Sequence, residues 1–102
     1  MEDIHKIFSQ FKEEFPEIHA KQRALGKEVH EKGGPLDGKS RWLIKMAISG
    51  ACNHKRALET HILKARAAGI NEDEIKHALL LLIPTAGFPA FMKSYAVLKS
   101  IK

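Results

Sequence analysis

Apolar residues recur at intervals of three and four along the whole chain, and β-branched and aromatic residues never gather into alternating runs. The first apolar stripe covers residues 2 to 14, and a second follows Pro16 and continues to about Glu31. Gly33-Gly34-Pro35 then interrupts the pattern with the strongest loop signal in the sequence. The pattern predicts an all-α fold, a small bundle of about five to six helices.

Residues that favour helix ends mark the limits of the next two predicted helices. Asp37 or Ser40 can accept a hydrogen bond from the first turn of a third helix, which ends at a turn around residues 50–53. A fourth helix is predicted from Asn53 to Ala68, because the glycine that follows readily adopts the left-handed conformation that closes a helix.

A fifth helix is predicted to open at Asn71, which forms a capping-box pair with Glu74. Residues 79–83 of this helix are apolar on every side, a pattern typical of a helix surrounded by protein. Pro84 is expected to break or kink it, before a turn at 87–89 and a last helix. A single chain of 102 residues can hardly surround a helix completely, so we expect a homo-oligomer.

The length of 102 residues indicates one domain that spans residues 1–102. No apolar run approaches the roughly 20 residues that a membrane span needs, and the start of the chain lacks the order of a signal peptide. We therefore expect a cytoplasmic protein that does not insert into membranes. The single cysteine, Cys52, is consistent with a reducing compartment.

The chain carries 17 Lys and Arg against 12 Asp and Glu, a formal charge of +5. These cations are spread along the sequence and are not interleaved with aromatic residues, so we expect no nucleic-acid binding. An anionic small molecule fits the positive charge equally well and is the expected partner.

Two histidines stand out on the predicted fourth helix. At about 100° per residue, His54 and His61 lie about 20° apart on its apolar stripe. A buried imidazole can act as a general acid or base, although it can also be a core residue hydrogen-bonded to a backbone carbonyl. The other four histidines fall on mixed or polar positions and are expected to be solvated: His5, His19, His30 and His77.

A metal site is not expected, because residues seven apart on a helix are separated by about 10.5 Å along its axis. The sequence has no H-E-x-x-H or C-x-x-C motif and no glycine-rich phosphate loop, so no cofactor is expected either. Cys52 precedes a predicted helix start, where amide dipoles favour a thiolate. It is either a reactive thiol or structural filler, and we favour filler because no second cysteine can resolve it.

Residues 36 to 91 closely resemble the carboxymuconolactone decarboxylase and alkylhydroperoxidase D-like family of small all-helical proteins. Five elements carry the resemblance: Leu36-Asp37-x-Lys39-x-Arg41, the apolar helix to Ser49, His61 followed eight residues later by Gly69, Asn71-x-x-Glu74-Ile75, and Gly87-x-Pro89. The resemblance implies a trimer, or a hexamer built from dimers or trimers.

The resemblance also assigns positions in the motif of the family's thiol peroxidases. His61 takes the motif histidine, His54 and Ala57 take the two cysteine positions, Arg56 takes an aromatic position and Trp42 an acidic one. The decarboxylase branch lacks the cysteine pair and keeps the histidine, so it is more similar to this chain.

The resemblance therefore implies a decarboxylase-like enzyme in which His61, with His54 beside it, is the general acid/base for a small carboxylated molecule. Trp42 would line the substrate site, and Arg56, Arg41 or Lys45 would supply its cation. Two alternatives stay open. One is a thiol-dependent alkyl hydroperoxide reductase that uses Cys52, and the other is a non-enzymatic oligomeric binding protein with a degenerate site.

Overall fold

The computed structural model describes residues 4–101, in which all regular structure is helical, and this confirms the all-α prediction. Seven helices follow one another in these residues: α1 (Ile4–Glu14), α2 (Pro16–Lys32), α3 (Gly38–Ala51), α4 (Lys55–Ala67), α5 (Glu72–Leu80), α6 (Leu82–Ala86) and α7 (Phe88–Ser100). Contacts divide the chain after the predicted loop into two compact units, residues 1–35 and 36–102. The assignment of residues 1–102 to one domain stays a prediction.

The first unit contains α1 and α2, which pack against each other. His19 of α2 is only 8% exposed, and its ring lies 5.4 Å from that of Phe8 and 6.2 Å from that of Phe11, between ring centroids. The prediction that His19 is solvated is therefore wrong. A histidine on a short helix pair takes an interior position when aromatic side chains of the neighbouring helix cover it.

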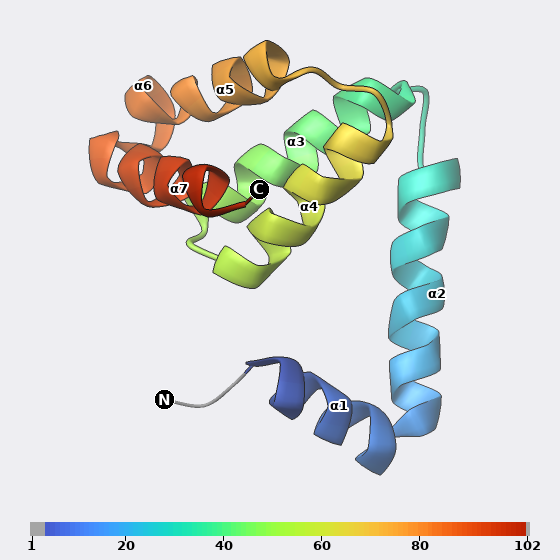
Figure 1. The fold of residues 1–102 in the computed structure, drawn as a ribbon. Helices are drawn as coiled ribbons and strands as arrows, with labels where there is room; N and C mark the ends of the chain where they lie inside the picture. The colour runs from blue at the N-terminus through green and yellow to red at the C-terminus, as the bar shows by residue number, and fades with distance from the viewer. Residues whose placement is uncertain (1–3, 102) are drawn as a thin grey trace. The chain divides into compact units, whose positions relative to one another are not determined.

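The second unit holds the main core. Helices α3 and α4 lie side by side, and α7 packs against both of them as well as against α5 and α6 (Figure 1). Four large side chains from three helices, besides the small Ala65, are completely excluded from solvent: Met46, Ile62, Ile75 and Leu79. Burying apolar side chains of this size contributes about 1.5–3 kcal/mol each, so these contacts fix α3, α4 and α5 relative to one another.

Local hydrogen bonds fix where α3 and α5 begin. The Asp37 carboxylate accepts a hydrogen bond of 2.7 Å from the backbone N–H of Ser40. Asn71 and Glu74 form the predicted capping box, with distances of 2.8 and 3.2 Å. Each cap satisfies amide groups that have no partner within the helix, which confirms the two predicted helix starts.

The break after α5 comes earlier than the sequence predicted. The helix ends at Leu80, and Pro84 lies within the first turn of α6 rather than at the break. Proline has no N–H to donate to the carbonyl four residues before it, and its ring clashes with that carbonyl. The residue four positions before Pro84 is Leu80, and this is where α5 ends.

The residues expected to be apolar on all sides divide into two groups. Leu79 and Leu82 are buried, whereas Leu80, Leu81 and Ile83 are 46%, 55% and 37% exposed. The second unit therefore buries only some of the apolar side chains of residues 79–83 and leaves the others exposed.

Gly50 lets α7 approach the end of α3. A Cβ atom added at this position would lie 2.5 Å from Ser94 Oγ and 3.1 Å from Leu82 Cδ1. Any larger residue must therefore shift the Ser94 and Leu82 side chains or the helices that carry them.

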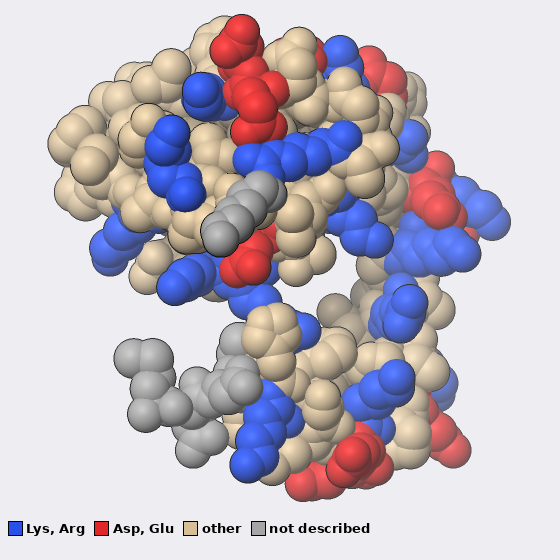
Figure 2. All heavy atoms as spheres, in the orientation of Figure 1, with Lys and Arg blue, Asp and Glu red and all other residues tan. Residues whose placement is uncertain are grey.

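On the face shown in Figure 2, Lys and Arg stand singly or in small groups among acidic and uncharged residues. Within residues 4–101, no helix combines the length and apolar character that a membrane crossing requires.

We predict that Gly50→Ala lowers the free energy of unfolding by about 1–3 kcal/mol, because the new methyl group overpacks the contact with Ser94 and Leu82. Gly26→Ala is the matched control, since nothing lies within 4 Å of a Cβ atom there. This second change should stabilise α2 by about 0.5–1 kcal/mol. Urea denaturation measures the free energy of unfolding of both variants. If both substitutions changed it in the same direction, Gly50 would not be closely packed against Ser94 and Leu82.

A second prediction concerns the cap of α3. The hydrogen bonds from the Ser40 backbone and side chain hold the pKa of Asp37 below 3.8. Because the pKa is lower in the folded state, the carboxylate stabilises the fold above pH 3.8, and this contribution is lost as the pH falls through the folded pKa. Asp37→Asn keeps an oxygen that can accept the Ser40 bond but does not titrate.

We therefore expect the variant Asp37→Asn to lose less stability on acidification than the wild type. Urea denaturation between about pH 5 and pH 2.5 measures the difference. An identical acid dependence in the two proteins would show that Asp37 does not contribute in this way.

Candidate functional site

His61 is held by a hydroxyl from the neighbouring helix. It lies in the middle of α4 and is half-buried, and its Nδ1 is 3.0 Å from Oγ of Ser49, which is 5% exposed. Ser49 sits near the end of α3, so the extensive packing between α3 and α4 brings the two side chains together.

A serine hydroxyl can both donate and accept a hydrogen bond. It donates to Nδ1 when that nitrogen carries no proton, and it accepts from Nδ1–H when the nitrogen is protonated. A backbone carbonyl can only accept, and would hold the proton on one nitrogen. The Ser49 partner is therefore compatible with both protonation states of His61, as acid/base chemistry requires.

Trp42 and Lys45 extend the site along α3. The Trp42 ring lies 6.0 Å from the His61 ring between centroids, and Lys45 Nζ lies 4.7 Å from the centre of the Trp42 ring. Partial burial, together with the positive charge of Lys64, lowers the pKa of the Lys45 amine from its ordinary value. The predicted Trp42 thus lies beside His61, and a cation lies over its indole.

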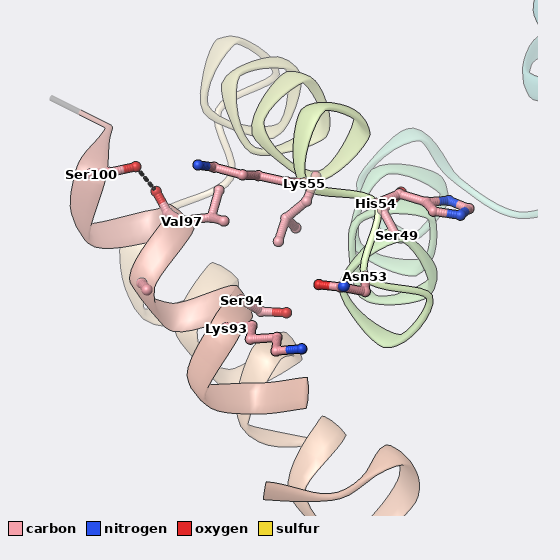
Figure 3. A pocket seen from close by; sticks show the side chains of 11 residues that line it. Ser49, Asn53, His54, Lys55, Lys93, Ser94, Val97 and Ser100 are labelled. Carbon is pink, nitrogen blue, oxygen red and sulfur yellow. Dashed lines mark hydrogen bonds between the residues drawn. The ribbon is translucent and has the colours of Figure 1, made fainter. Parts of the chain in front are cut away.

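His54 does not share the position expected for it. Helix α4 begins at Lys55, and His54 is its N-cap residue, with an exposed side chain that makes no capping hydrogen bond. Figure 3 shows its imidazole pointing away from the space between α4 and α7. The prediction that His54 occupies the buried stripe is therefore wrong, because the helical angle applies only to residues inside the helix.

The two predicted arginines occupy helix starts. Arg41 is half-buried in the first turns of α3, where its Nε donates a hydrogen bond of 3.3 Å to the carbonyl of Asp37. Arg56 is half-buried in the first turn of α4. The third cation considered from the sequence, Lys45, contacts the Trp42 ring, which in turn lies beside His61.

Cys52 is exposed, and it caps the C-terminal end of α3. It is therefore not buried filler, which corrects the favoured interpretation. The N-cap of α4 is His54, so the argument that places Cys52 at the positive end of that helix does not hold either.

A cavity of about 340 Å³ lies between α7 and the turn that joins α3 to α4 (Figure 3). Ser49 lines it together with Ser94 and Lys93 of α7, and His54 borders it although its imidazole points away from the space. Sequence reasoning missed Ser49 and Ser94, because a small polar residue on an apolar helix face is compatible with simple packing. Among residues 4–101, no three His, Cys, Asp or Glu side chains are grouped to hold a metal ion.

The comparisons with known proteins agree with the fold. A crystal structure of an apo carboxymuconolactone decarboxylase family protein from Legionella pneumophila superposes with a TM-score of 0.81, covering 96% of this chain and 87% of that one. The two sequences are 24% identical, so this likeness shows the fold alone. No curated protein matches the chain significantly. The model of the carboxymuconolactone decarboxylase family matches residues 16–100, most of the chain, and the protein therefore belongs to this family.

Proposed function

We propose that the protein is a decarboxylase-like enzyme in which His61 is the general acid/base for a small carboxylated molecule. The observation that carries this proposal is the hydrogen bond of 3.0 Å between His61 Nδ1 and Ser49 Oγ. This bond orients a half-buried imidazole, and the serine hydroxyl can pair with Nδ1 whether or not that nitrogen carries a proton.

The chemistry needs one proton and one cation. When the bond between the carboxylate and its neighbouring carbon breaks, carbon dioxide leaves, and the electron pair stays on that carbon as a carbanion or enolate. The His61 imidazolium gives its proton to this carbon, and the neutral imidazole is then reprotonated from water. A cation near the developing negative charge lowers the barrier.

Lys45 is the best-placed group for that cation. Its amine lies over the Trp42 indole, which also lies beside the His61 ring. The indole holds the amine by a cation–π contact in a partly desolvated position, where its charge acts more strongly than in water. Arg41 and Arg56 remain the alternatives for binding the substrate carboxylate.

One observation favours a second candidate, a thiol-dependent hydroperoxide reductase. The Cys52 thiol is exposed, so a hydroperoxide and an external thiol could both reach it. The chain contains no second cysteine, so each turnover would require an external thiol to release oxidised Cys52. A third possibility is a non-enzymatic binding protein, which would bind a carboxylate without turning it over.

We predict that His61→Ala lowers turnover by about two to four orders of magnitude, because the proton donor is lost. A thermal-shift screen of small carboxylic acids would first identify a substrate, since a ligand of the folded state raises the melting temperature. Release of carbon dioxide then measures turnover. His54→Ala is the matched control, and we expect a much smaller effect because the His54 ring is exposed and points away from the cavity.

The melting temperature of each variant separates catalysis from folding. Full activity in His61→Ala, or a loss of activity explained by unfolding, would show that His61 is a structural residue. Cys52→Ser should keep the activity. If it instead abolished hydroperoxide reduction in a folded protein, the thiol reductase would be the correct function.

We also propose that the chain forms a homo-oligomer, a trimer or a hexamer, through the apolar surface of α5 and α6. Leu80, Leu81 and Ile83 are exposed there, and Leu81 borders a groove of about 400 Å³ whose other apolar residues come from α3, α5 and α6. Ile44 and Ile48 of α3, in the same unit, are also exposed, by 44% and 57%. Exposed apolar residues around an apolar groove are typical of subunit contacts.

We predict that Leu81→Glu shifts the assembly toward monomers, because a carboxylate in an apolar contact is left unpaired. Light scattering measures the mass, and circular dichroism checks that the subunit stays folded. Lys76→Glu, an exposed change on α5, is the control and should keep the assembly. A wild-type mass of 11.4 kDa at micromolar concentration would reject the proposal.

A further inference from the structure

The cavity beside α7 contains a buried hydroxyl without a partner. Ser94 is 1% exposed, and among residues 4–101 its Oγ has no hydrogen-bond partner. Figure 3 shows this hydroxyl directed into the space between α7 and the turn before α4. Leaving a buried polar group unsatisfied is costly, and each case in a native structure requires an explanation.

The surroundings of Ser94 are positively charged. Lys93 and Lys55 line the cavity, and none of its 11 lining residues is Asp or Glu. The cavity also borders the start of α4, whose N-cap makes no side-chain hydrogen bond. The positive end of a helix and two ammonium groups both favour an anion.

Asn53 adds a neutral hydrogen-bonding group on the opposite wall. It has a φ of +59°, a left-handed conformation that asparagine tolerates better than most residues. This conformation turns the chain between α3 and α4, and Figure 3 shows the Asn53 amide facing the side of the cavity that holds Ser94.

The remaining walls are apolar. Leu58 of α4 and Val97 of α7 are 2% and 7% exposed, and Ala96 lies beside them in the lining. A volume of about 340 Å³ is within the range of small-molecule sites, and it exceeds the space that a simple inorganic anion needs. The cavity thus combines hydrogen-bond donors and positive charge with apolar surface.

We propose that this cavity binds a small carboxylate with an apolar body. The carboxylate accepts a hydrogen bond from Ser94 Oγ and is attracted by Lys93 and Lys55, while the apolar body packs against Leu58 and Val97. Inorganic phosphate matches the charge of the site but not its apolar walls.

The cavity is also connected to His61. Ser49 lines it and makes the hydrogen bond of 3.0 Å to His61 Nδ1. Ser49 thus stands between the cavity and the acid/base group, which is not itself among the lining residues. Identification of this carboxylate as the substrate rests on the proposed function, whereas its binding does not.

Hexanoate, hexanamide and inorganic phosphate are the probes for this site. NMR titration of the wild-type protein should show hexanoate shifting the amide resonances of residues 53–55 and 93–97. Hexanamide, which lacks the charge, and phosphate, which lacks the apolar body, should each bind at least about tenfold more weakly. Equal binding of hexanoate and hexanamide, or shifts confined to other residues, would overturn the proposal.

Two variants test the assigned groups. Ser94→Ala should weaken hexanoate binding about tenfold, because a hydrogen bond to a charged group is lost. It should also raise the melting temperature of the ligand-free protein, because the unsatisfied hydroxyl is removed. Lys93→Gln should weaken binding about threefold, and Lys99→Gln on the same helix, outside the cavity, should leave it unchanged.

A further variant tests carboxylate binding in the cavity independently of the proposed decarboxylation. His61→Ala should keep hexanoate binding even where it abolishes turnover, so failure of the catalytic role leaves the site intact. A Ser94→Ala protein that binds hexanoate as the wild type does, or that melts at a lower temperature, would show that the hydroxyl has a structural role and would overturn the assignment.

Discussion

The last turn of α3 is constrained on several sides, because two adjacent residues face three other helices, α4, α6 and α7. Ser49 bonds to His61 of α4, and Gly50 leaves room for Ser94 and Leu82. The two positions cannot exchange roles, since a side chain at residue 50 meets Ser94 Oγ at 2.5 Å. The candidate acid/base group and the buried hydroxyl of α7 are thus positioned by the same turn.

The two serines next to this turn have different environments. The Ser49 hydroxyl has a side-chain partner in His61, whereas the Ser94 hydroxyl has none among the described residues. A satisfied buried hydroxyl stabilises an arrangement, and an unsatisfied one lowers stability until a ligand or water binds it. Because of this difference, the Ser49–His61 pair is suited to proton transfer, whereas the Ser94 hydroxyl is suited to binding a carboxylate.

The apolar surface of α5 and α6 has a different origin. Pro84 ends α5 at Leu80, so the following residues turn away from the helix that would otherwise continue. The turn leaves Leu80 and Leu81 exposed while Leu79 and Leu82 complete the core. One proline therefore divides a continuous apolar segment into a core part and a surface part.

The sequence by itself determined the helices, because their signals are local. Periodic apolar residues, the Asn71–Glu74 capping box and the Asp37 cap act over three or four residues, and the family motif located His61 on α4. The same reasoning misplaced His54, since the exact start of α4 decides whether a helical angle applies to it. It also took His19 as solvated, because the aromatic rings beside it, those of Phe8 and Phe11, come from another helix.

Only the tertiary structure decided the partners of these residues. Ser49 and His61 are 12 residues apart on different helices, and Gly50 meets Ser94 from a third. No periodicity encodes such contacts, since they depend on how side chains from distant segments fill a common interior. The sequence thus specified which helices form and which histidine belongs to the family motif, whereas packing between helices determined the hydroxyl that orients this histidine and the one that is left without a partner.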